Sequence, residues 1–262
     1  MYNLKNKISL GFLGVLTSTL LSQCNINKAE SNSNEVGNTK STIVNNVKDF
    51  KDYYPSGNVK EIGQFIEERK TGKWTLYYED GEIQSIENFK NGKRDGYYKT
   101  DYSGELYMEG WFKEDIKTGV WKSYFKETKT LKYLKQYDDK GLANGEWKNY
   151  YDSGEIASIE NYLNGKANGK QTEYFKNGKI HTTGEKVNGK QNGLWKYYFD
   201  NGNLKCEREF KDGVDDGKYV EYFKNGKIYK TGKKVNFKKS GEWKIYDEQG
   251  NLLDTVLYKN DD

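Results

Sequence analysis

The chain has 262 residues, of which 34% are hydrophobic and 31% are charged, and its formal net charge is only +4. Apolar residues are scarcer than in ordinary globular chains, but the 15% share of Phe, Trp and Tyr excludes the aromatic-poor composition of a disordered chain. Lysines alternate with acidic residues, which excludes the basic stripe of a nucleic-acid-binding domain. Interleaved lysines and aromatics also form platforms for single-stranded nucleic acid. A half-buried aromatic sheet with a charged face accounts for the pattern better, and we expect no nucleic-acid partner.

Residues 1–24 have the pattern of an export signal. Lys5 and Lys7 precede an apolar stretch at residues 8–21, which is short for a membrane span. The stretch ends in LLSQC, which resembles the lipobox of bacterial lipoproteins, with Leu21, Ser22 and Cys24 in matching positions and Gln23 where a small residue is usual. The resemblance implies a lipid on Cys24. An ordinary cleaved signal and an uncleaved anchor are the alternatives.

Residues 25–49 are rich in Asn, Ser and Thr and poor in apolar residues, which predicts a flexible polar tether. A folded domain is expected from residue 50 to residue 262. With a lipid on Cys24, the protein would be exported and held at a membrane of the cell envelope.

A unit of 23 to 26 residues repeats along this domain. Each unit begins with a glycine, at Gly72, Gly96, Gly119, Gly145, Gly169, Gly193, Gly217 and Gly241. Two positions later comes an aromatic residue, except at Gln171; the aromatics are Trp74, Tyr98, Trp121, Trp147, Trp195, Tyr219 and Trp243. An aromatic doublet such as Tyr77–Tyr78 follows, then a turn such as Asp80–Gly81 and an aliphatic residue such as Ile83.

Two short apolar runs joined by Asp-Gly, Ser-Gly or Asn-Gly predict a β-hairpin. The repetition predicts an all-β fold, an elongated single-layer antiparallel sheet of stacked hairpins. The segment KETKTL, residues 126–131, lacks the turn glycine and predicts an irregular loop. Gly184 and Gly232 interrupt their strands, with Val187 and Val235 in the late apolar position, which predicts a bulge in each of these strands.

This pattern resembles the MORN repeat family, named for membrane occupation and recognition nexus. It is most similar to the bacterial variant class, to which YwqK-type antitoxins belong. The resemblance spans about residues 50–262 and implies stacked β-hairpins with a non-catalytic role in binding proteins or lipids.

No residue pattern predicts catalysis, a metal site or a cofactor site. His181 is the only histidine, and its spacing places it on a surface strand. With Cys24 lipidated, Cys206 is left alone and is expected to fill space in its strand. DGVDDG, residues 212–217, lacks the alternating ligands and final Glu of a calcium loop. We expect no enzyme activity.

Side chains alternate between the two faces of a strand, so the first residue of each doublet faces away from the repeated Trp. Six of these residues are expected to form a partner-binding face: Tyr77, Tyr124, Tyr150, Tyr174, Tyr198 and Tyr222. Tyrosine suits a half-wet recognition surface. The alternative is that these tyrosines only stiffen the sheet.

The expected partner is an unidentified protein, with a cognate toxin as one candidate. An antitoxin or immunity role and direct binding to a lipid surface are the alternatives. An export signal disfavours a toxin that acts in the cytosol.

Overall fold

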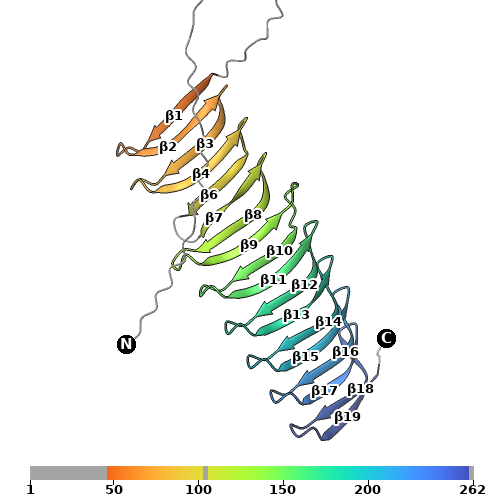
Figure 1. The fold of residues 1–262 in the computed structure, drawn as a ribbon. Helices are drawn as coiled ribbons and strands as arrows, with labels where there is room; N and C mark the ends of the chain where they lie inside the picture. The colour runs from red at the N-terminus through yellow and green to blue at the C-terminus, as the bar shows by residue number, and fades with distance from the viewer. Residues whose placement is uncertain (1–45, 103–105, 260–262) are drawn as a thin grey trace, which may run out of the picture. The chain divides into compact units, whose positions relative to one another are not determined.

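The computed structural model describes residues 46–102 and 106–259 (Figure 1). Within these ranges the chain consists of strands and turns, without helix. The strands are β1 (Val47–Tyr53), β2 (Val59–Ile66), β3 (Arg69–Tyr77), β4 (Ile83–Lys90), β5 (Lys93–Arg94), β6 (Gly96–Tyr102), β7 (Leu106–Lys113), β8 (Ile116–Phe125), β9 (Leu131–Tyr137), β10 (Gly145–Tyr150), β11 (Ile156–Leu163), β12 (Lys166–Tyr174), β13 (Ile180–Val187), β14 (Lys190–Tyr198), β15 (Leu204–Lys211), β16 (Val214–Tyr222), β17 (Ile228–Val235), β18 (Lys238–Tyr246) and β19 (Leu252–Tyr258).

All strands belong to one 19-stranded sheet. Each strand pairs antiparallel with its neighbour in the chain, as in β1–β2 and β18–β19. The one local exception is β4, which pairs with both β5 and β6. Figure 1 shows the strands following one another in chain order. The predicted all-β sheet of stacked hairpins is confirmed. Its first strand begins at Val47, three residues before the start expected from the sequence.

The hairpin turns have a common geometry. In the hairpin of β3 and β4, Tyr78 N donates to Glu82 O at 2.8 Å and Gly81 N donates to Tyr78 O at 3.0 Å. Gly81 has φ of 90°, a conformation that costs glycine little. In the loop between β8 and β9, which lacks the glycine, Lys129 adopts φ of 56° instead. The loop predicted to be irregular therefore contains a residue in the left-handed backbone conformation that is not glycine.

The register shifts wherever one hairpin meets the next. Between β13 and β14, Thr183 lies opposite Lys196 and Glu185 lies opposite Asn192, so that Gly184 alone faces three residues of β14. The same shift occurs opposite Gly63, Gly110 and Gly232. The extra residues include the first glycine of each repeat.

A register shift does occur at Gly184 and at Gly232, as predicted, but the strands that carry these glycines have no extra residue of their own. Both glycines lie in regular register with the strand before them, and the extra residues belong to the strand that follows. These glycines are needed for a steric reason instead.

A tryptophan ring lies directly on each of these four glycines. A Cβ atom at Gly184 would come within 2.3 Å of the ring of Trp195. The other pairs are Gly63 with Trp74, Gly110 with Trp121, and Gly232 with Trp243. The indole nitrogen of Trp195 donates to Glu185 O at 3.1 Å, so the buried N–H group is satisfied. Only glycine leaves room for this contact.

Other aromatic rings and cations cover the tryptophans. Trp74 is 2% exposed and lies within 4.9 to 6.2 Å, between ring centroids, of Phe50, Phe65 and Phe89. The amine of Lys70 lies 3.7 Å from the centroid of the same ring. Each such burial contributes about 1.5–3 kcal/mol, and the cluster joins four successive strands.

Repeats without tryptophan use a different contact at the same place. The Nδ2 atom of Asn161 donates to Lys170 O at 2.8 Å, and Gln171 occupies the tryptophan position. Asn88 makes the same bond to Tyr97 O. In these two repeats Glu87 and Glu160 occupy the position of the glycine, and the asparagine that follows each of them makes the bond.

Substituting Gly184→Ala should lower the thermal midpoint, because the new methyl group would overlap the Trp195 ring. Overpacking of this kind costs about 1–3 kcal/mol. In a Trp195→Leu background the same substitution should be nearly neutral, since Gly184 has no left-handed φ. Thermal unfolding followed by circular dichroism measures all four variants of the cycle. An equal cost in both backgrounds would contradict the ring contact.

Candidate partner-binding face

The sheet has two chemically different faces. Trp74 and Tyr77 are three residues apart on β3 and therefore point to opposite sides. We call the side with the six tyrosines predicted from the sequence the tyrosine face. All six are half-buried, whereas four of the tryptophans on the other side are no more than 2% exposed.

An aliphatic residue lies opposite each tyrosine in the neighbouring strand. The pairs are Tyr77–Ile83, Tyr124–Leu131, Tyr150–Ile156, Tyr174–Ile180, Tyr198–Leu204 and Tyr222–Ile228. Ile83 is 48% exposed and Ile228 is 39% exposed. The structure thus brings the tyrosines into one strip with aliphatic side chains, beside the hairpin turns. The aliphatic residues follow the turn glycines at a constant spacing, so the sequence alone could have predicted that they lie in this strip.

Two of the tyrosines are held by glutamates. The hydroxyl of Tyr124 donates to Glu109 Oε1 at 2.8 Å, and that of Tyr222 donates to Glu207 Oε2 at 2.9 Å. Burial, followed by the bond to the carboxylate, raises the pKa of Tyr124 to about 12 and that of Tyr222 to about 12. These two rings are fixed in place, which agrees in part with the alternative that the tyrosines stiffen the sheet.

Glu109 gathers three donors on the tyrosine face. Tyr97 donates to its Oε2 atom at 2.8 Å, and the amine of Lys122 lies 3.6 Å from Oε1. Burial raises the pKa of Glu109, but the bonds from Tyr97, Tyr124 and Lys122 outweigh burial and leave that pKa below its usual value. Sequence reasoning missed this glutamate, because nothing in the repeat marks one acidic residue among many.

The tyrosine series is interrupted at Asp101. A hollow of about 210 Å³ lies there, lined on the tyrosine face by Ile83, Ile86, Lys99, Asp101 and Tyr107. Its walls are aliphatic and aromatic, and a carboxylate and an amine stand at its side. A hollow of this size accepts one large side chain.

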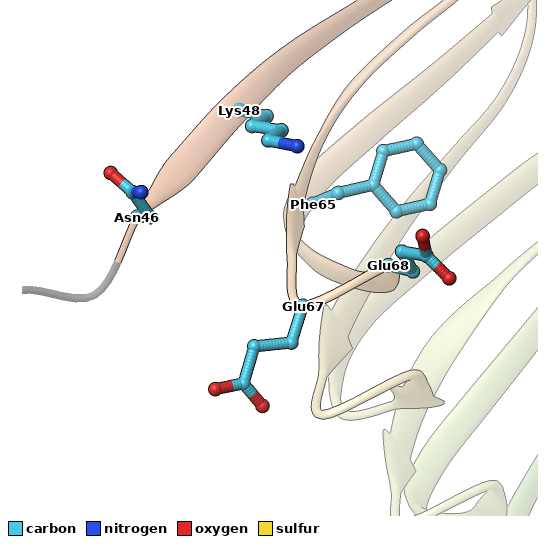
Figure 2. A pocket seen from close by; sticks show the side chains of 5 residues that line it. All are labelled: Asn46, Lys48, Phe65, Glu67 and Glu68. Atoms are coloured by element: carbon cyan, nitrogen blue, oxygen red, sulfur yellow. The ribbon is translucent and has the colours of Figure 1, made fainter.

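A larger open groove of about 730 Å³ lies at the β1 edge of the sheet. Figure 2 shows the ring of Phe65 between Lys48 and Glu68, with Glu67 pointing away from them and Asn46 at the start of β1. Neither a histidine nor a cysteine lines this groove.

The remaining residues of interest lie apart from the tyrosine strip. His181 is exposed on β13 and its Nδ1 atom lies 3.6 Å from Glu173. Cys206 is 8% exposed on β15. Residues 46–102 and 106–259 contain no cluster of His, Cys, Asp and Glu able to hold a metal ion. Cys24, the expected lipidation site, lies outside the described residues.

No helix in the described part of the chain has both the length and the hydrophobicity needed to cross a bilayer.

Comparison with known families finds seven copies of the MORN repeat variant, at residues 47–67, 70–91, 143–164, 167–185, 191–212, 215–233 and 239–260. The copies cover more than half of the chain, and the chain therefore belongs to the MORN repeat variant family. Between the second and third copies, β6 to β9 continue the same antiparallel pairing.

No curated protein matches the chain significantly. A solved crystal structure described as TcdB2-TccC3-TEV is 13% identical over 79% of this chain, with a TM-score of 0.18. This chain spans 14% of the length of that one, and so low a TM-score supports no conclusion about function.

The burial of Tyr124 and its bond to Glu109 predict a late alkaline titration of this phenol. The pKa of Tyr124 is higher in the folded protein than the value of about 10 in an unfolded chain. Its contribution to stability is therefore complete below pH about 10 and is lost between pH about 10 and 12. Ultraviolet titration of the protein and its Tyr124→Phe variant isolates this phenol by difference.

The variant Glu109→Gln keeps Tyr124 but removes the carboxylate. In this variant the titration midpoint of Tyr124 should fall below 12. The midpoint is again measured by difference, here between Glu109→Gln and the double variant Glu109→Gln with Tyr124→Phe. An unchanged midpoint would show that Glu109 contributes nothing to the shift.

Proposed function

We propose that this protein is a non-catalytic repeat scaffold that binds a protein partner across its tyrosine face. The observation that supports this best is the strip of half-buried tyrosines and half-buried or exposed aliphatic residues on one side of the sheet. Tyrosine contributes contact area to a protein interface at low entropic cost and keeps its hydroxyl group in water.

The chemistry of the strip favours a protein over a small molecule. Ile83 and Ile228 are separated along the sheet by many strands, each about 4.8 Å from the next, so a ligand that covers the strip is a macromolecule. The hollow beside Asp101 offers one pocket for an inserted side chain, and interfaces concentrate their binding energy at such pockets. A toxin covered by this face would be neutralised, which is a special case of the same role.

We further propose that a lipid on Cys24 holds the scaffold at a membrane of the cell envelope. The support is the basic start, the short apolar stretch and the LLSQC ending of residues 1–24. The polar residues 25–46 would then separate the lipid from β1.

Replacing Tyr150, Tyr174 and Tyr198 together by Ser should abolish partner capture, because three large contact side chains are lost from the centre of the strip. The probe is the full chain, cross-linked in native membranes, with the bound protein identified by mass spectrometry. The far-ultraviolet circular dichroism and the thermal midpoint should stay nearly unchanged.

The matched control replaces three exposed aliphatic residues at the other ends of the strands, Ile116, Leu163 and Val187, by Ser. The control variant should capture the same protein as the parent. Capture that survives in the tyrosine variant, or a tyrosine variant that unfolds, would overturn the assignment of this face.

Substituting Cys24→Ser should move the protein from the membrane fraction to the soluble fraction, because the thiol that carries the lipid is absent. The circular dichroism of the repeat sheet should be unaffected. A variant that stays in the membrane with its first 23 residues intact would show that residues 8–21 anchor the chain directly.

A further inference from the structure

The two most exposed large apolar side chains of the described residues both lie on β19. Leu257 is 73% exposed and Leu253 is 64% exposed. One and two repeats earlier, the position of Leu257 is held by Lys233 and Glu209, both exposed. The last strand therefore has an apolar side chain at a solvent-facing position that is charged in the preceding repeats.

The outer edge of β19 has no partner strand among residues 46–102 and 106–259, where β19 pairs with β18 alone. A free edge presents a row of unpaired N–H and C=O groups, and soluble proteins usually protect it with charge. The edge strand β1, VKDFKDY, carries four charged residues, whereas β19, LLDTVLY, carries one. Exposed leucines beside unpaired backbone groups suit a second β-strand as the occupant.

We propose that β19 pairs antiparallel with the β19 strand of a second copy of this chain, about a two-fold axis normal to the sheet. Such an interface uses the same surface of both copies and closes on itself. It pairs the free backbone groups and covers Leu253 and Leu257 of both copies. The proposal is independent of the partner proposed for the tyrosine face.

The other strand of a second copy that could pair with this edge is β1, in a head-to-tail arrangement, and its side chains do not fit. If β19 of one copy paired with β1 of another in the register that joins successive repeats, Val256 would occupy the position that Gly232 has within the chain. Phe50 of the other copy would occupy the position of Trp243. A branched side chain would then stand where the ring needs bare backbone. Asp254 would also lie opposite Asp52, and like charges directly opposite are destabilising.

A two-fold axis normal to the sheet keeps each face on its own side. The tyrosine faces of the two copies would therefore lie on the same side of one continuous sheet. A partner with two equivalent sites would bind such a dimer with increased avidity.

Sedimentation of the full chain in mild detergent, over a range of protein concentrations, tests the proposal. We expect a reversible dimer and no larger species. The double variant Leu253→Lys with Leu257→Lys should weaken dimerisation at least tenfold. The matched variant Leu163→Lys with Leu194→Lys, at exposed leucines of interior strands, should not. A chain that is monomeric at every concentration, or two variants that behave alike, would overturn the proposal.

Cysteine cross-linking identifies the strands that pair. Thr255→Cys, in the middle of β19, should form a covalent dimer with a short thiol cross-linker, and the parent chain should not. A mixture of the Thr255→Cys and Lys51→Cys chains should yield only the dimer of Thr255→Cys. Cross-linking between position 255 of one copy and position 51 of the other would establish the head-to-tail arrangement and contradict the two-fold pairing.

Discussion

The structure depends on a close contact between an indole ring and bare backbone. Trp74, Trp121, Trp195 and Trp243 each lie on a glycine of the preceding strand, at a distance that any Cβ atom would prevent. A single-layer sheet has no second layer to cover its apolar side chains. A flat ring lying on neighbouring backbone buries itself within the layer. The register shift opposite each glycine allows this approach.

This contact also divides the chemistry of the sheet between its faces. Because the tryptophans bury themselves among neighbouring strands on one side, the other side retains tyrosine and aliphatic residues that are half exposed. Each contact joins adjacent hairpins, as expected for a repeat array in which stability is a sum of nearest-neighbour terms. Where Gln171 replaces the aromatic residue, its Oε1 atom is buried without a hydrogen-bond partner. The repeat that lacks the aromatic residue therefore leaves one buried acceptor unsatisfied.

The sequence was sufficient to predict the hairpins, their order and the face on which the six tyrosines lie, because turn glycines and side-chain alternation are local properties. It did not explain Gly184 and Gly232, whose need is set by Trp195 and Trp243 on another strand. The pairing of Tyr124 with Glu109 was also beyond prediction, because the two residues meet across strands and acidic residues occur throughout the repeat. The indole–glycine pairing could have been found, since Gly63, Gly110, Gly184 and Gly232 each precede a tryptophan by the same interval.

Hydroxyl-radical footprinting with mass spectrometry tests the division between the faces most directly, because it reports the solvent accessibility of each aromatic side chain in the folded protein. The structure predicts strong protection of Trp74, Trp121, Trp195 and Trp243, together with measurable oxidation of Tyr77, Tyr150, Tyr174 and Tyr198. Tryptophan is intrinsically more reactive toward hydroxyl radicals than tyrosine. In the unfolded chain the tryptophans would therefore be oxidised faster than the tyrosines, the reverse of the order expected in the folded protein. Oxidation of the four tryptophans at the rate of the unfolded chain would contradict the indole–glycine contact on which the fold depends.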